Sequence, residues 1–112
     1  MKIEEVFARR RFIMLDGAMG TQLQLRGLTT EQKPELAAFI MPDVLTAVHR
    51  DYARAGADIL LANTFGANPR KLKGTGYTVQ QVIDASIACA RTAAQETGAL
   101  VALDIGPIGE LL

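Results

Sequence analysis

The stretch LLANTFGANPRK (residues 60–71) changes abruptly from apolar to polar. Its first residues belong to the short, largely apolar run Asp58 to Ala62, which is typical of a buried strand. Gly66 and Pro69 then interrupt any regular structure. The stretch therefore predicts a strand that ends in a loop carrying an amide, a hydroxyl and an aromatic ring. A loop that only reverses the chain does not require these functional groups.

Two further segments repeat this pattern of an apolar run followed by a polar exit that contains glycine. Phe12 to Leu15 lead into Asp16-Gly17, and Leu100 to Leu103 lead into Asp104-Ile105-Gly106-Pro107. All three runs are largely apolar rather than alternating. This is the pattern expected of parallel strands that are covered on both faces.

Helical patterns lie between the predicted strands. Apolar residues recur on one helical face from Asp43 to Gly56 and again from Thr78, a candidate N-cap, to Gly98. Shorter helices are predicted at Ala18 to Leu25 and at Ile3 to Arg9. The order strand, helix, strand, helix, strand predicts an α/β fold with right-handed crossovers, that is, a parallel βαβαβ segment.

In folds of this class the chemistry gathers at the carboxyl ends of the parallel strands. These ends supply the candidate substrate-binding residues, which are Asp16, Gly17, Ala18, Asn63, Thr64, Phe65 and Asp104. Each also has a structural alternative. Asp-Gly is a common turn, an asparagine or threonine here is typical of a turn that caps the next helix, and an aspartate at a strand end is typical of a cap. No catalytic residue is predicted among them.

The single histidine and the single cysteine lie away from the strand ends. His49 falls on the predicted helix 43–56 and is expected to be a boundary residue rather than a catalytic one. Cys89 lies between two alanines on the helix 78–98 and is expected to pack as a small hydrophobic residue. The chain is therefore predicted to hold no metal ligands and no internal disulfide.

The bulk composition narrows the class of protein. The chain has 112 residues, 49% of them hydrophobic and 21% charged, which suits one small globular domain. The 12 basic residues balance the 12 acidic residues, so charge does not favour nucleic acid or an anionic membrane as a partner. The charged N-terminal stretch lacks the apolar core of a signal peptide, and no apolar run approaches the about 20 residues of a membrane span. These features predict a cytoplasmic protein.

Three motifs in register resemble one known family. The motifs LDGAMGTQLQLRG (15–27), AGADILLANTFGAN (55–68) and DIGPIGEL (104–111) are similar, in order and spacing, to the start of the homocysteine S-methyltransferase domain. They most resemble the N-terminal module of cobalamin-dependent methionine synthases, and the likeness spans residues 12–112. One departure is that many members carry an acidic residue and a threonine where this chain has Leu61 and Ala62.

The resemblance implies a (β/α)8 TIM barrel that transfers a methyl group to the thiol of homocysteine. It places Asp16 and the backbone amides after it around the amino-acid end of the substrate. It also implies a zinc ion, held by cysteines of later strands, which lowers the pKa of the thiol so that a thiolate attacks. Such a barrel takes about 250 residues. Residues 1–112 are therefore expected to be its incomplete N-terminal part, without the zinc ligands and inactive by themselves.

The resemblance leaves the methyl donor open. Methylcobalamin on another module is the donor implied by the closest likeness, and a betaine-type or S-methylmethionine-type enzyme is the alternative. A different alternative is a non-catalytic piece that only self-associates. Strands cut from a barrel leave unpaired edges and an apolar face. The chain is therefore expected to be homo-oligomeric through its third strand or the tail DIGPIGELL (104–112), unless that tail covers the edge within a compact monomer.

Overall fold

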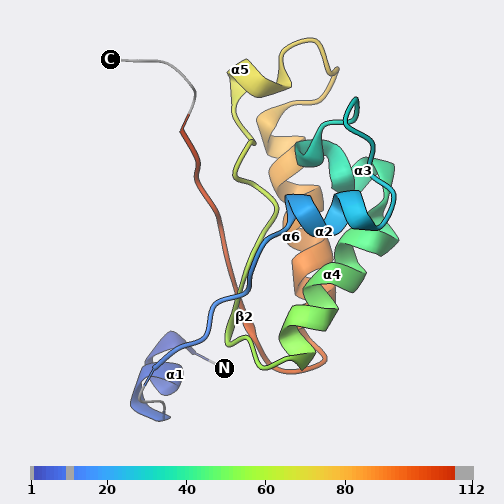
Figure 1. Ribbon diagram of the computed structural model, residues 1–112. Coiled ribbons are helices and arrows are strands. Elements are labelled where there is room, and N and C mark those ends of the chain that lie inside the picture. Colours follow the sequence, from blue (N-terminus) through green and yellow to red (C-terminus); the bar gives the residue numbers. More distant parts are fainter. Residues whose placement is uncertain (1, 10–11, 108–112) are drawn as a thin grey trace.

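The computed structural model describes residues 2–9 and 12–107 of the chain. Figure 1 shows several helices gathered on one side of the strands, with the N-terminal helix set apart from them. The elements, in chain order, are α1 (Ile3–Arg9), α2 (Gly20–Leu25), the 3₁₀ helix η1 (Pro34–Leu36), α3 (Ala37–Ile40), α4 (Pro42–Arg54), β1 (Ile59–Leu61), α5 (Pro69–Leu72), α6 (Val79–Ala94) and β2 (Leu100–Ala102).

The second and third predicted strands form a parallel pair, as expected. β1 pairs with β2 in the register Ile59 to Leu100, Leu60 to Val101 and Leu61 to Ala102. Leu60 lies at the centre of β1 and is fully buried. The chain therefore has a mixed helix and strand fold built on a parallel sheet, with α6 as the crossover between β1 and β2.

The first predicted strand, 12–15, is largely wrong. Among the described residues it contributes only one parallel bridge, between Leu15 and Ile59. The carbonyl of Met14 accepts from the amides of Asp58 (2.7 Å) and Ile59 (3.3 Å), but the amide of Met14 donates to the Asp58 side chain (2.9 Å). Phe12, Met14 and Leu15 are 67%, 49% and 54% exposed, so this segment lacks the cover that a central strand needs.

The two long helices begin and end close to where their sequences predict. α4 starts at Pro42, a residue suited to the first helical position, and Gly56 follows it with a left-handed φ of +110°. Thr78 and Gln81 form a capping box at the start of α6, with hydrogen bonds of 2.9 and 3.1 Å between each side chain and the other's backbone amide. Such caps stabilise a helix by about 1 kcal/mol.

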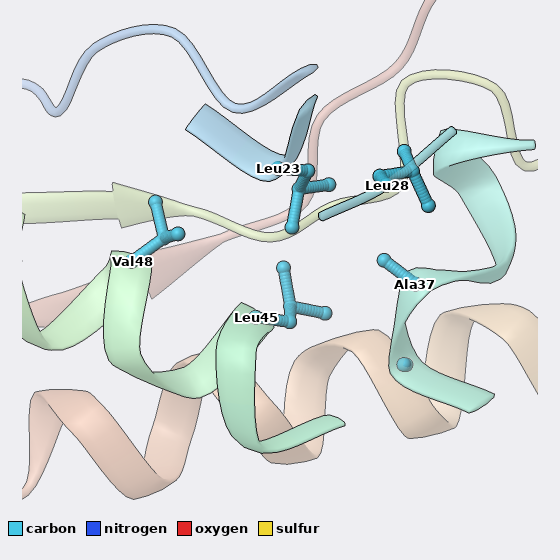
Figure 2. Packing of buried hydrophobic residues seen from close by; sticks show 6 residues of the cluster. Leu23, Leu28, Ala37, Leu45 and Val48 are labelled. Carbon is cyan, nitrogen blue, oxygen red and sulfur yellow. The ribbon is translucent and has the colours of Figure 1, made fainter. Parts of the chain in front are cut away.

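The main core lies between α2, α3 and α4. Figure 2 shows its buried side chains turned toward one another, namely Leu23, Leu28, Ala37, Leu45 and Val48. Cys89 of α6 is partly buried and packs against this cluster, as expected for a small hydrophobic residue. A second cluster joins Ala53 of α4 and the end of α6 to Leu60 of β1.

The expectation for His49 is corrected by this packing. His49 is not a boundary residue, because it is fully buried on α4 and neither ring nitrogen has a hydrogen-bond partner among residues 2–9 and 12–107. Burial lowers its pKa from 6.5 to about 4, since the charged imidazolium is costly away from water. His49 is therefore neutral at physiological pH.

Apolar side chains stay open to solvent in the segment that bridges to β1 and in the segment after β2. They include Met14, Leu15, Leu103 and Ile105, which are between 45% and 81% exposed. Residues 108–112, the last part of the tail expected to mediate self-association, lie outside the described residues. Within residues 2–9 and 12–107, no helix combines the length and apolar character needed to cross a membrane.

Candidate functional site

The predicted strand exits come together around one cavity of about 390 Å³. Six of the seven predicted site residues line it, namely Asp16, Gly17, Ala18, Asn63, Phe65 and Asp104. The remaining one, Thr64, is not on its wall. The parallel pairing explains this convergence, because the carboxyl ends of neighbouring parallel strands lie at the same edge of a sheet.

Asp16 is held at the floor of the site by backbone contacts. Its amide donates to the carbonyl of Ile59 (3.2 Å), and its Oδ2 accepts a hydrogen bond from the amide of Leu61 (3.1 Å). Burial raises the pKa of Asp16 above its usual value, and the nearby carboxylate of Asp104 raises it further, against the lowering effect of the backbone hydrogen bonds. The site therefore favours a cationic partner that would stabilise the ionised carboxylate.

The loop after Asp16 is fixed from behind by Tyr52 of α4. The Tyr52 hydroxyl donates to the carbonyl of Ala18 (2.7 Å), and a Cβ on Gly17 would lie 3.0 Å from the Tyr52 ring. A side chain at this position would therefore make a tight contact with the ring, which glycine avoids. The amides of residues 17–20 donate no hydrogen bond to any other described residue, so a run of backbone donors is free for a ligand.

Thr64 joins two strand exits instead of lining the cavity. It is 3% exposed; its Oγ1 donates to the carbonyl of Asp104 (2.7 Å) and accepts from the amide of Asp104 (2.9 Å). The hydroxyl therefore ties the end of β1 to the end of β2 and sets the position of Asp104. A helix-capping turn, the structural alternative for this threonine, is not what the contacts show, because the partner is the next strand exit and Asn68 caps α5.

Asn63 and Phe65 lie on the cavity wall with different environments. Asn63 donates from Nδ2 to the carbonyl of Pro34 (2.7 Å), which anchors the loop before α3 to the end of β1. Phe65 is 50% exposed, and the Nζ of Lys71 lies 5.6 Å from its ring centroid. A Cβ on Gly106 would come within 2.5 Å of the Phe65 carbonyl oxygen, so Gly106 permits the close approach expected of it.

Seven wall residues were not predicted from the sequence, namely Met19, Gly20, Pro34, Glu35, Leu61, Ala62 and Gly66. Five of them, Met19, Gly20, Leu61, Ala62 and Gly66, lie within the quoted motifs and within two residues of a predicted site residue, which was a usable signal. Pro34 and Glu35 come from a loop with no strand before it, and only the proline at the start of a 3₁₀ turn marks them.

Among residues 2–9 and 12–107 no group of three or more histidine, cysteine or acidic side chains could hold a metal ion. Cys89 lies on α6, with its Sγ 3.9 Å from the carbonyl of Pro42, and does not line the cavity. The described residues therefore do not fit the zinc site that the family resemblance implies. The prediction that its ligands come from later strands stays a prediction.

Comparisons with known proteins agree with the motifs. The family model of the homocysteine S-methyltransferases matches residues 13–112. The chain is 41% identical over 98 residues to the methionine synthase of Mycobacterium tuberculosis, covering 80% of this chain and 8% of that protein. It is 31% identical over 117 residues to the homocysteine S-methyltransferase of Escherichia coli, covering 93% of this chain and 38% of that enzyme.

A solved structure has a similar arrangement of elements. The metallated form of the homocysteine methyltransferase MmuM from Escherichia coli superposes with a TM-score of 0.85 at 28% identity, over 96% of this chain and 42% of that one. The chain thus spans less than half the length of these relatives.

Proposed function

This chain belongs to the homocysteine S-methyltransferase family, and on that premise we propose that it forms the substrate-binding part of an enzyme that methylates homocysteine. The product of this transfer to the thiol is methionine. The observation that carries the proposal is the cavity itself, where the free backbone amides of residues 17–20 share one wall with the half-buried carboxylate of Asp16.

These groups complement the two charges of an amino acid. Backbone N–H groups donate hydrogen bonds to a carboxylate, and a carboxylate accepts hydrogen bonds from an ammonium. Gly17 and Ala18 would supply amides to the substrate carboxylate, while Asp16 would bind its ammonium. Tyr52 supports this binding mode because its hydroxyl holds the carbonyl of Ala18 on the side away from the ligand. Phe65 and Asp104 would complete the wall, and Asn63 and Thr64 would hold neighbouring segments in place.

We further propose that residues 1–112 are the N-terminal part of a (β/α)8 barrel that the rest of a longer protein completes. The parallel β1–α6–β2 unit is the repeating element of such a barrel. In the full-length protein a zinc ion held outside the described residues would lower the pKa of the homocysteine thiol. Methylcobalamin on another module is the proposed methyl donor, with betaine or S-methylmethionine as the alternative donors.

Substitution of Asp16 by asparagine in the full-length protein tests the binding mode. Loss of a charge-assisted hydrogen bond costs about 1.5–3 kcal/mol, so calorimetry should show homocysteine binding about ten- to a hundredfold more weakly. An unchanged dissociation constant would remove Asp16 from the site. Failure of the unmodified protein to form methionine from homocysteine with any of the three donors would remove the proposed function.

Stability provides an independent readout of the same variant. A raised pKa means that folding opposes ionisation of Asp16, so this group's contribution to stability is present at low pH and is lost as pH rises through the raised pKa. Asp16→Asn removes the charge and can keep the acceptor for the Leu61 amide. The variant should therefore be no less stable than the unmodified protein at neutral pH, although it binds the ligand less well.

A further inference from the structure

The geometry points to Glu35 as a further specificity-determining residue, one that recognises the ammonium group of the substrate. This inference rests on the proposed function, because it names a second anionic group in the same amino-acid site. Glu35 belongs to the short helix η1 and lines the cavity together with Asp16 and Asp104.

Two hydrogen bonds bring the loop of Glu35 to the cavity. The Nδ2 of Asn63 donates to the carbonyl of Pro34 (2.7 Å), next to Glu35 in the chain. The Nζ of Lys33 donates to the carbonyl of Lys71 (2.7 Å), which ties the same loop to α5. Asn63 is therefore a positioning residue for Glu35, since it fixes the backbone from which the glutamate side chain extends.

Gly66 provides the space that the Glu35 side chain occupies. Gly66 is buried, and its φ lies outside the left-handed region, so backbone conformation does not explain the need for glycine. A Cβ at this position would overlap the side chain of Glu35, including its carboxyl carbon and Oε1. The glutamate side chain thus lies directly against the backbone of the β1 exit rather than extending into solvent.

The carboxylate of Glu35 is available to a ligand. It makes no hydrogen bond or ion pair within residues 2–9 and 12–107. The two lysines near this loop are engaged elsewhere, as Lys33 binds a backbone carbonyl and Lys71 lies over the Phe65 ring. A half-buried carboxylate without a protein partner gains from binding a cation.

The charge of the cavity wall supports an ammonium rather than a neutral or anionic group. Its charged lining side chains are Asp16, Glu35 and Asp104, and none of the lining residues is lysine, arginine or histidine. An amino acid can place its ammonium among these groups and its carboxylate on the free amides. A thiol acid that lacks the ammonium would bring only a negative charge to a negative wall, so the site should discriminate against it.

The test compares two ligands and two matched variants of the full-length protein. Dissociation constants are measured by calorimetry for homocysteine and for 4-mercaptobutanoate, which keeps the thiol and the carboxylate but lacks the ammonium. Glu35→Gln should weaken homocysteine binding about ten- to a hundredfold and leave 4-mercaptobutanoate binding unchanged or stronger. Glu31→Gln is the control, because Glu31 is exposed on the same loop and does not line the cavity.

A second variant, at Gly66, perturbs the position of the Glu35 side chain without substituting Glu35 itself. Gly66→Ala should displace the Glu35 side chain and reproduce the loss of discrimination between the two ligands. Equal homocysteine affinity in Glu35→Gln and Glu31→Gln would overturn the role of Glu35 while leaving the proposed function intact. Equal weakening of both ligands by Glu35→Gln would also overturn it, because a merely structural role does not distinguish them. An unmodified protein that binds no homocysteine would remove the proposed function and this inference together.

Discussion

Replacement of His49 by leucine should make the stability of this chain less dependent on pH. His49 is fully buried, both of its ring nitrogens lack hydrogen-bond partners in the described part of the chain, and burial lowers its pKa from 6.5 to about 4. Because the folded-state pKa is depressed, the stability linked to this group is present above pH 6.5 and is lost as pH falls toward 4. Protonation of the unfolded chain drives this loss.

The size of the effect follows from the shift. Each unit of pKa difference corresponds to about 1.4 kcal/mol, so a shift of about 2.5 units removes about 3 kcal/mol once both states are protonated. At pH 5 the unfolded chain is largely protonated at this group and the folded chain is not, which gives a loss of about 2 kcal/mol relative to pH 7.5. His49→Leu should remove this loss. The variant should also gain about 1–3 kcal/mol at neutral pH, because it no longer buries two unpaired polar atoms.

Urea unfolding between pH 5 and pH 7.5 measures these differences directly. His49→Gln is the matched control, since it abolishes the titration but keeps a buried polar group. It should show the flat pH dependence of His49→Leu without its gain at neutral pH. The acidic groups titrate in all three proteins, so their contribution cancels in the comparison. The reasoning is refuted if His49→Leu keeps the pH dependence of the unmodified chain, or if NMR shows the His49 ring titrating near 6.5.

Three further predictions concern the strand exits, metal binding and self-association. Thr64→Val should destabilise the chain by about 1–3 kcal/mol, because it leaves the buried backbone groups of Asp104 without their partner. Thr92→Val at an exposed position of α6 should cost only about 0.5 kcal/mol, and an equal cost in thermal unfolding would contradict the role given to Thr64. The 112-residue chain should bind no stoichiometric zinc, because its described residues hold no ligand cluster, and elemental analysis that finds one zinc per dialysed chain would contradict this. The same chain should be a dimer or larger, because exposed Met14, Leu15, Leu103 and Ile105 leave apolar surface uncovered. Light scattering that gives a mass of 12.1 kDa at every concentration would instead indicate a monomer, and a non-catalytic self-associating piece would lose its support.

Local patterns in the sequence predicted the elements that depend on near neighbours. α4 follows its proline and the periodicity of its apolar face, and α6 follows the Thr78–Gln81 capping box. The parallel pairing of β1 and β2 also followed from their apolar runs and the crossover helix between them. The convergence of six predicted residues on one cavity came from the same rule, since parallel strands end at a common edge.

Contacts between segments far apart in the chain decided the features that these local patterns did not predict. The amide of Met14 bonds the side chain of Asp58, 44 residues away, and the expected first strand is reduced to a single bridge between Leu15 and Ile59. Thr64 binds the backbone of Asp104 across 40 residues, and Asn63, which also lines the cavity, binds the carbonyl of Pro34 across 29 residues. The loop of Glu35 is held at the cavity by this bond and by the bond between Lys33 and the carbonyl of Lys71, 38 residues away.

Helix caps and apolar periodicity involve residues about four positions apart, so they can be predicted from the sequence alone. The burial of His49 and the placement of Glu35 depend instead on which surfaces meet when the chain packs. A short motif does not predict which surfaces pack together, because the neighbours that bury a side chain can lie anywhere in the chain.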